Sequence, residues 1–185
     1  MTLWRVRPYG NNQLGSITIK ILPPQPLSSQ HDCSGFSSGI DALDSWFRDK
    51  AQKNQTARAT RTYVVCSEDG NIVGYFSLAA GAVRHQISTG KARRNMPDPI
   101  PAVILARLAV HQNFQGNGIG HSMLKDAVAR VLQSAESIGV RVMLVHALDE
   151  NAKNFYKYFG FKSSPIEEMT LMATLDDLKA SASSA

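Results

Sequence analysis

The sequence predicts a mixed α/β fold, in which helices flank a mixed central sheet within one domain. Two observations lead to this class: the first half contains two β-branched and aromatic runs joined by a turn, and the second half alternates apolar strands with helices. The chain has 185 residues, of which 43% are hydrophobic, and a chain of this size buries enough apolar surface for one compact core. Disordered, collagen-like and coiled-coil classes are therefore excluded.

Residues 1–16 lack periodicity and contain several Gly, Pro and Asn residues, so we expect a flexible N-terminal extension. We expect the domain itself to span residues 17–176. Its first element is a half-buried strand, because apolar and polar residues alternate in SITIKIL until two prolines end the run. The apolar positions of this strand are Ile17, Ile19 and Ile21.

A helix is expected next. Ser38 followed by Asp41 resembles a capping box, and the helix then ends near Gln55. Its apolar face consists of Ile40, Leu43, Phe47 and Ala51.

Two strand-like runs after this helix predict a hairpin. Residues 62–67 and 72–80 are rich in β-branched and aromatic side chains, and the sequence EDGN between them suits a turn. A proline-rich loop follows the hairpin.

The second half of the chain alternates strands and helices. The 102–110 run is almost continuously apolar, which is typical of a central strand. The elements expected after it are a long helix over 119–138 with Met123, Ala127, Val131 and Ala135 on one face, a strand over 140–147, a short helix over 151–158 ended by Gly160, and a last strand over 169–175. The small and polar residues 177–185 predict a disordered tail.

The positive charge is concentrated in two segments. Residues 48–61 and residues 79–107 each carry a net charge of +4, whereas the whole chain carries +5. The remainder of the chain is therefore acidic. Two basic segments on an acidic chain suggest a polyanionic partner, although a solvated charged surface remains the alternative.

The cysteines and histidines do not suggest a metal site. Cys33 and Cys66 form neither a disulfide framework nor a zinc-type pair, and the five histidines lack ligand spacing. We therefore expect a reduced, cytoplasmic protein without a metal. The sequence also lacks a signal-peptide pattern and an apolar run of about 20 residues, so no membrane association is expected.

A glycine-rich segment between the 102–110 strand and the long helix is the main candidate for a binding site. Gly116, Gly118 and Gly120 come directly before or within the first helical turn, where unpaired N–H groups and the helix dipole favour a phosphate. The segment lacks the Gly-Lys-Ser/Thr ending of a Walker A loop, and its spacing is not that of a Rossmann loop. Taken alone, such a turn could be only a tight connection.

Two motifs in order resemble the GNAT superfamily of acetyl-CoA-dependent N-acetyltransferases. The sequence QGNGIG, residues 115–120, is similar to the Q/R-x-x-G-x-G/A signature and follows a strand that carries LAV. The sequence ENAKNFYKYFGF, residues 150–161, resembles the closing motif of that superfamily. The resemblance covers about residues 17–176 and implies a single GNAT domain.

The resemblance implies a role for individual residues. The strand residues Leu108, Ala109 and Val110 would hold the pantetheine arm of acetyl-CoA through their backbone. The pyrophosphate would bind Gln115, Gly116, Asn117, Gly118, Ile119 and Gly120. Asn151 would contact the cofactor near the pantetheine, and Tyr156 would be the general acid for the departing thiolate.

Three further segments resemble the GNAT toxins of bacterial type II toxin–antitoxin systems. They are FSSGIDALDSWF, the block NQ…RTYVV, and Gly74-Tyr75-Phe76. The family implies an enzyme that acetylates the α-amino group of aminoacyl-tRNA and inhibits translation. It also implies a homodimer and a ribbon-helix-helix antitoxin, with which the toxin represses its own operon by binding operator DNA only as the complex.

The chemistry of the substrate amine fits this resemblance. A lysine amine is almost wholly protonated at neutral pH, whereas an α-amino group titrates about two to three units lower. The AVILARLAV strand contains no carboxylate that could act as a base, which favours an α-amine over a lysine. His111, His146 and Glu68 remain open as groups that the fold could bring to the site.

Tyr156 and the basic residues each have a structural alternative. Tyr156 lies among aromatic residues that could simply cover a core edge, but a protonated phenol in this motif suits a general acid. The candidates for tRNA phosphate contacts are Lys50, Arg58, Arg61, Lys91, Arg93 and Arg94.

Two other functions remain open at the level of sequence. One is a GNAT that acetylates a protein or small-molecule amine, and the other is a non-catalytic acetyl-CoA-binding corepressor module. The sequence does not identify the preferred aminoacyl-tRNA.

Overall fold

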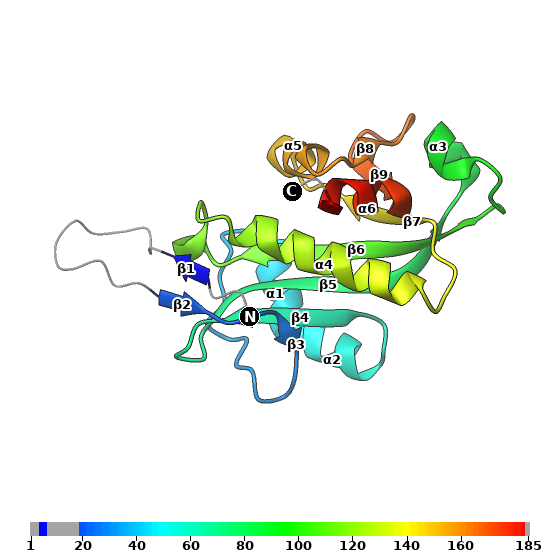
Figure 1. The fold of residues 1–185 in the computed structure, drawn as a ribbon. Helices are drawn as coiled ribbons and strands as arrows, with labels where there is room; N and C mark the ends of the chain where they lie inside the picture. Colours follow the sequence, from blue (N-terminus) through cyan, green and yellow to red (C-terminus); the bar gives the residue numbers. More distant parts are fainter. Residues whose placement is uncertain (1–3, 7–18, 184–185) are drawn as a thin grey trace. The chain divides into compact units, whose positions relative to one another are not determined.

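The computed structural model describes residues 4–6 and 19–183. Its strands and helices alternate from residue 72 to residue 163, whereas several strands follow one another directly in the first part of the described chain (Figure 1). The elements are β1 Trp4–Val6, β2 Ile19–Ile21, β3 Gln25–Pro26, α1 Asp41–Asp49, α2 Ala51–Thr56, β4 Arg61–Cys66, β5 Ile72–Val83, α3 Gly90–Arg93, β6 Ile100–Val110, α4 Ile119–Ala135, β7 Val142–His146, α5 Glu150–Tyr158, β8 Lys162–Ser163, β9 Thr170–Thr174 and α6 Leu175–Ser183, with short 3-10 turns at His85–Ile87 and Gln112–Phe114.

The main sheet is mixed and has seven strands in the order β3-β4-β5-β6-β7-β9-β8. Strands β4 and β5 form the antiparallel hairpin that the sequence predicted. Strands β6 and β7 are parallel, and their pairing runs from Ala102–Val142 to Leu105–Val145. Strand β9 is antiparallel to β7. The predicted mixed α/β fold is therefore confirmed.

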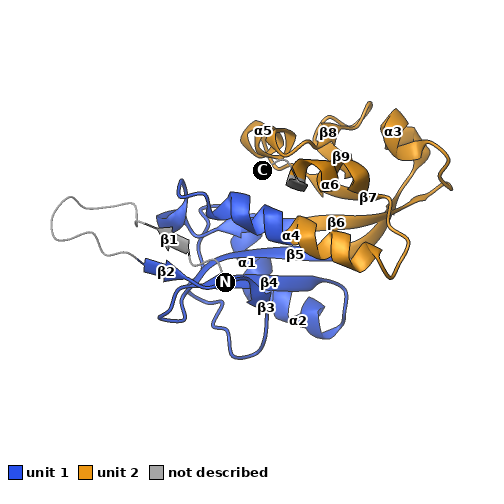
Figure 2. Ribbon diagram, in the orientation of Figure 1, with its two compact units in different colours: residues 1–78, 107–126 blue, residues 79–106, 127–185 orange. Residues whose placement is uncertain are grey.

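The chain divides into two compact units (Figure 2). Unit 1 comprises residues 1–78 and 107–126, and unit 2 comprises residues 79–106 and 127–185. Strands β5 and β6 and helix α4 each begin in one unit and end in the other.

The core of unit 1 is aromatic. The rings of Phe47 and Tyr75 stack at 4.0 Å between centroids, and Phe36 meets both of them edge-on. The hydroxyl of the buried Tyr75 donates a 2.9 Å hydrogen bond to the carbonyl of Leu43 in α1. This bond satisfies the polar end of a ring that is otherwise surrounded by apolar atoms.

The core of unit 2 is aliphatic. Buried side chains from β5, α3, β6, β7 and β9 pack together there: Val83, Ala92, Ile100, Ala102, Val142, Leu144 and Met172. Gly81 permits this packing, because a Cβ at that position would lie 2.5 Å from Cδ1 of Ile104.

The start of α1 differs from the sequence-based expectation. The N-cap residue is Ile40, which is exposed and makes no side-chain cap, so the capping box of Ser38 with Asp41 is wrong. Ser38 instead donates two hydrogen bonds to Oδ1 of Asp44, from its backbone N–H at 2.8 Å and from its hydroxyl at 2.6 Å. The expected apolar face holds for Leu43, Phe47 and Ala51, which are buried.

The C-terminal end corrects the sequence analysis as well. The expected flexible extension lies outside the described residues except for residues 4–6, which form β1 and pair antiparallel with β2. The expected disordered tail is helical as far as residue 183. The tail folds because Leu178 is buried and Thr174 caps the helix by accepting a hydrogen bond from the N–H of Asp177.

Candidate active site

The glycine-rich segment lies in unit 1 between β6 and α4. Gly116 and Gly118 both have φ of +76°, a left-handed conformation that other residues rarely adopt. A Cβ at either position would meet no atom within 4 Å, so the space beside the two glycines is open. Glycine is therefore required for the backbone conformation here.

The same segment presents a row of unpaired donors. Within the described part of the chain, the backbone N–H groups of residues 116–120 have no hydrogen-bond acceptor. These donors lie at the N-terminus of the 17-residue helix α4, where the helix dipole favours an anion. The geometry therefore suits a phosphate or pyrophosphate group.

Two side chains of the segment hold the loop itself. The Nε2 atom of Gln115 donates to the carbonyl of Ser38 at 2.8 Å and to that of Val110 at 3.0 Å. The Nδ2 atom of Asn117 donates to the carbonyls of Phe114 and Gln115 at 3.2 and 3.0 Å. Both side chains therefore shape the anion site through backbone carbonyls.

The preceding strand carries the residues expected to hold the pantetheine arm. Leu108 and Val110 are half-buried and Ala109 is buried. Gly74 allows a close approach there, since a Cβ on it would lie 3.2 Å from the carbonyl oxygen of Ala109 and 2.6 Å from Sδ of Met123.

Helix α5 in unit 2 carries the two residues of the second motif. Tyr156 is buried between Phe155 and Phe161, and burial raises the pKa of its phenol. The hydroxyl is therefore protonated at neutral pH, as a general acid must be. Asn151 is exposed in the first turn of the helix.

A buried lysine fastens α5 to the segment before β9. The ammonium of Lys153 pairs with Glu168 and, at 3.2 Å, with Glu150. The lysine side chain is only 3% exposed. The sequence analysis did not identify Lys153, because a lysine in a helix is usually solvated.

The six candidate phosphate contacts are divided between the units. Lys50, Arg58 and Arg61 lie in unit 1, and Lys91, Arg93 and Arg94 lie in unit 2; all six are exposed. Two of them have partners within the protein: Arg61 donates to the carbonyl of Gln55 at 3.4 Å, and Lys91 pairs with Asp177. A phosphate at Lys91 would have to displace that carboxylate.

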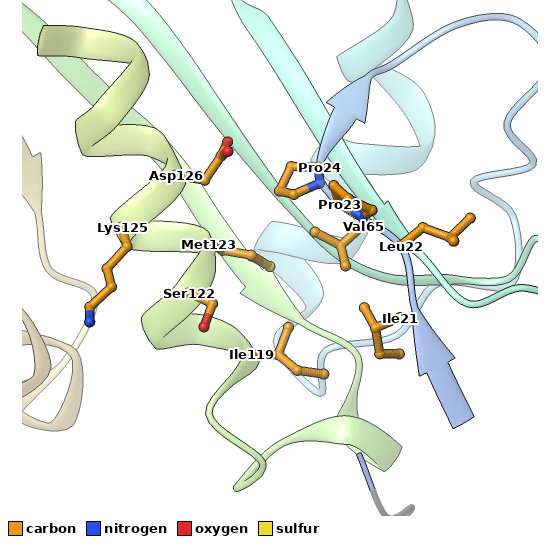
Figure 3. A pocket seen from close by; sticks show the side chains of 10 residues that line it. All are labelled: Ile21, Leu22, Pro23, Pro24, Val65, Ile119, Ser122, Met123, Lys125 and Asp126. Carbon is orange, nitrogen blue, oxygen red and sulfur yellow. The ribbon is translucent and has the colours of Figure 1, made fainter. Parts of the chain in front are cut away.

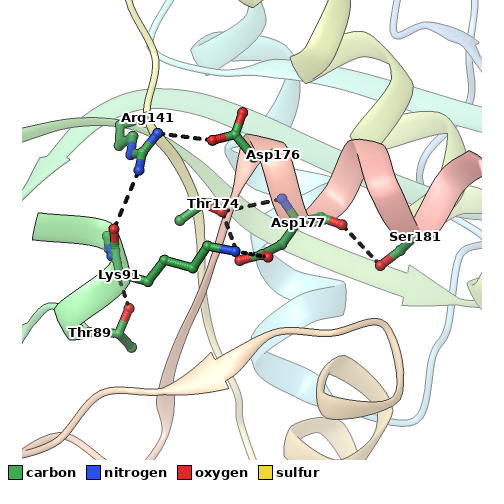
Figure 4. Close-up of polar contacts among 8 residues, drawn as sticks. Thr89, Lys91, Arg141, Thr174, Asp176, Asp177 and Ser181 are labelled. Atoms are coloured by element: carbon green, nitrogen blue, oxygen red, sulfur yellow. Dashed lines mark hydrogen bonds and ion pairs between the residues drawn. The ribbon is translucent and has the colours of Figure 1, made fainter. Parts of the chain in front are cut away.

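Figure 4 shows how α6 holds this basic segment of unit 2. Asp177 accepts from Lys91 and from the hydroxyl of Thr174. Arg141 donates to Asp176 at 3.1 Å and to the backbone carbonyl of Lys91 at 3.4 Å. The C-terminal helix therefore fixes the position of α3.

Unit 1 also contains a cavity of about 480 Å³ that the sequence analysis did not identify. Figure 3 shows its lining residues, which come from β2 and the two prolines after it, from β4, and from the first turns of α4. They are Ile21, Leu22, Pro23, Pro24, Val65, Ile119, Ser122, Met123, Lys125 and Asp126. Most of this lining is apolar.

No cluster of three or more potential metal ligands occurs among residues 4–6 and 19–183. In the same residues, no helix is both long enough and apolar enough to cross a membrane.

Unit 1 contains a glycine-rich loop suited to an anion, and unit 2 contains a buried, protonated tyrosine on α5. Residues 59–163 match the acetyltransferase (GNAT) domain. The chain therefore belongs to the GNAT acetyltransferase family.

The chain is similar to a named protein over most of its length. It is 43% identical over 157 residues to the tRNA-acetylating toxin of Mycobacterium tuberculosis strain ATCC 25618 / H37Rv. The aligned region covers 85% of this chain and 94% of that protein.

Two solved structures share the fold. A crystal structure of a tyrosine-to-phenylalanine variant of KacT superposes with a TM-score of 0.80 at 22% identity, covering 86% of this chain and 98% of KacT. AtaT complexed with acetyl-methionyl-tRNAfMet gives a TM-score of 0.79 at 23% identity, again covering 86% and 98% of the two chains.

Proposed function

We propose that this protein transfers the acetyl group of acetyl-CoA to the α-amino group of aminoacyl-tRNA, and that it is thereby the toxin of a type II toxin–antitoxin system that inhibits translation. The observation that carries the proposal is the 43% identity to a tRNA-acetylating toxin across 94% of that protein. The anion loop and the protonated tyrosine supply chemistry that this reaction needs.

The residues of unit 1 fit the pyrophosphate end of acetyl-CoA. The open space at Gly116 and Gly118 admits a phosphate close to the backbone, and five unpaired N–H groups face no competing acceptor among the described residues. The backbone of Leu108, Ala109 and Val110 holds the pantetheine arm. An AtaTR complex has been solved with AcCoA bound, which supports the assignment.

Residues of α5 act on the sulfur side of the reaction. Tyr156 gives its phenolic proton to the thiolate that leaves the thioester. Burial raises the pKa of this phenol, so it is protonated at neutral pH. Asn151 contacts the cofactor near the pantetheine.

The basic residues bind the phosphates of the tRNA. Arg93 and Arg94 are exposed on a segment that α6 fixes, and Lys50, Arg58 and Arg61 add positive charge in unit 1. Lys91 binds a tRNA phosphate after its ammonium exchanges the carboxylate of Asp177 for that phosphate. Charge supplied by arginine and lysine makes such binding sensitive to salt.

We further propose a homodimer that is neutralised by a ribbon-helix-helix antitoxin and that represses its operon only in this complex. The relative AtaT has been solved with the C-terminus of the antitoxin AtaR, and the AtaT–AtaR complex has been solved bound to DNA. Light scattering of the purified chain tests the dimer. Gel-shift measurements on upstream DNA, with and without the product of the neighbouring gene, test the repressor.

Acetyl transfer to bulk charged tRNA tests the main proposal. The protein is incubated with labelled acetyl-CoA and charged tRNA, and nuclease digestion followed by mass spectrometry identifies the acetylated aminoacyl-adenosine. Uncharged tRNA serves as the control and is expected to take up no label. Label on a lysine peptide or a polyamine, with none on charged tRNA, would contradict the proposal.

A further inference from the structure

A chain of three hydrogen-bonded side chains lies at the end of β7 in unit 2. The Nδ1 atom of His146 lies 2.9 Å from the hydroxyl oxygen of Thr170 on the neighbouring strand β9. That hydroxyl lies 2.9 Å from Oε2 of Glu167. Thr170 is buried, whereas the imidazole and the carboxylate reach solvent.

The donor and the acceptor of each of these two hydrogen bonds follow from the chemistry of the groups. A carboxylate can only accept, so the hydroxyl of Thr170 donates its proton to Glu167. The hydroxyl oxygen must then accept from His146, which therefore carries its proton on Nδ1. The consequence is that Nε2 of the neutral imidazole bears a lone pair and is available as a base.

The turn before β9 is built to hold Glu167. The hydroxyl of the buried Ser164 accepts hydrogen bonds from the backbone N–H groups of Ile166 and Glu167, at 3.3 and 3.2 Å. The N–H of Thr170 donates to the carbonyl of Glu167 at 2.9 Å. The adjacent carboxylate, Glu168, is occupied by Lys153, so the two acidic side chains have separate partners.

His146 lies at a distinctive point of the sheet. The pairing of β7 with β6 ends at Val145 opposite Leu105, and His146 is the next residue. Helix α5, with Tyr156, begins four residues later at Glu150. The imidazole thus follows the last paired position of two parallel strands, on the segment that leads directly into the helix of the general acid.

We propose that His146 is the proton acceptor for the substrate amine, oriented by Thr170 and Glu167. This inference rests on the proposed function, because it assigns the base for that same reaction. Nε2 of His146 takes one proton from the α-ammonium group, and the free amine forms the new C–N bond at the thioester carbonyl. The C–S bond then breaks, the thiolate takes the proton of Tyr156, and the second proton of the attacking nitrogen replaces the one that Tyr156 gave up. The hydrogen bond to Thr170 steadies the imidazolium that results.

The test compares acetyl transfer to charged tRNA by the wild type with that by two variants. His146→Ala is expected to lose about 100-fold in kcat, while its affinity for acetyl-CoA, measured by calorimetry, stays within about twofold of wild type. Added imidazole is expected to raise the kcat of His146→Ala about tenfold, since a free base can occupy the vacated space. His31→Gln, which changes a histidine of unit 1, is the control and should leave kcat unchanged.

Thr170→Val and Thr170→Ser separate orientation from packing. Thr170→Val is expected to lower kcat about tenfold, and Thr170→Ser, which keeps the hydroxyl, should retain most of the wild-type rate. Full activity of His146→Ala, or a loss that imidazole does not restore, would overturn the assignment of the base. Full activity of Thr170→Val would overturn the orienting role. A wild type that fails to acetylate charged tRNA would instead reject the proposed function, so the two failures are distinguishable.

Discussion

The side-chain amide of Gln115 donates a 2.8 Å hydrogen bond to the backbone carbonyl of Ser38, a residue 77 positions earlier in the chain. Ser38 is in turn held by Asp44 through its backbone N–H and its hydroxyl. The loop that presents the unpaired N–H groups is therefore braced against the start of α1. This connection ties the candidate anion site to a segment that is distant in sequence.

Replacing Gln115 tests this brace. Gln115→Ala removes two hydrogen bonds worth about 1 kcal/mol each, so we expect a loss of about 2 kcal/mol in stability, and the less ordered loop should bind acetyl-CoA roughly tenfold more weakly. Calorimetric titration with acetyl-CoA measures the effect. Gln112→Ala, an exposed glutamine in the same connection, is the control. Equal affinities of the two variants would contradict the brace.

Tyr156→Phe tests the general acid. The ring remains and keeps its contacts with Phe155 and Phe161, so we expect normal folding and acetyl-CoA binding. Turnover should fall by about 100-fold or more, since the proton donor is lost. The matched control is Tyr158→Phe, because Tyr158 is 79% exposed on the same helix. Wild-type turnover by Tyr156→Phe would show that the assignment is wrong.

Reversing the charge of two exposed arginines tests the tRNA contacts. Arg93→Glu combined with Arg94→Glu is expected to weaken tRNA binding and to make the plot of log affinity against log salt shallower by about 2. Filter binding at several salt concentrations gives this slope. Arg48→Glu combined with Lys53→Glu, which reverses two exposed charges outside the six candidate positions, controls for the same change in net charge. An unchanged slope would mean that these arginines do not contact phosphate.

Asp177→Asn tests the contact between α6 and α3. The hydrogen bond from Lys91 lowers the pKa of Asp177, so this carboxylate contributes stability above its unfolded pKa of about 3.9, and the contribution is lost as pH falls through the lower folded value. Because the pair is partly exposed, we expect a loss of about 1 kcal/mol at pH 7.

Thermal unfolding between pH 7 and pH 3 measures this difference. The Tm of Asp177→Asn should lie about 2–4 °C below that of the wild type at pH 7, and the two should converge at the acidic end. Glu136→Gln, which changes an exposed carboxylate, is the control. A constant difference in Tm at every pH would contradict the ionic contribution.

Cys33 provides a prediction about reactivity. Burial, and then the neighbouring charge of Asp32, raise the pKa of this thiol to about 11. Since the thiolate is the reactive form, alkylation at pH 8 should be about 100 times slower than for a free cysteine of pKa about 8.5, and it should accelerate as pH rises toward 11. Iodoacetamide labelling followed by mass spectrometry measures the rate, with Cys33→Ser as the control for labelling elsewhere. A rate equal to that of free cysteine would contradict the raised pKa.

Local patterns predicted most of the elements correctly. The β4–β5 hairpin, β6, α4, β7 and α5 follow from periodicity and from glycine or turn residues close in sequence, because such signals act within a few residues. The errors occurred where contacts between residues far apart in sequence determine the local structure. The tail was expected to be disordered from its small residues, yet Lys91 and Arg141 engage Asp177 and Asp176.

The candidate site divides in the same way. The glycines of the anion loop and Tyr156 were identified from the sequence, because a positive φ and a phenol are properties of the residues themselves. The partners of Gln115 and Lys91 became known only from the structure. It pairs the Gln115 side chain with Ser38 and the Lys91 side chain with Asp177. Neither pairing has a signal in the sequence.

The sequence by itself predicted most of the strands and helices, a glycine-rich loop that suits an anion and a tyrosine that suits a general acid. Only the tertiary structure decided that His146, Thr170 and Glu167 form one hydrogen-bonded chain, because β7 and β9 must pair in register before His146 lies opposite Thr170. Hydrogen bonds depend on distances of about 3 Å, and the folding of the chain sets those distances between residues that are far apart in sequence.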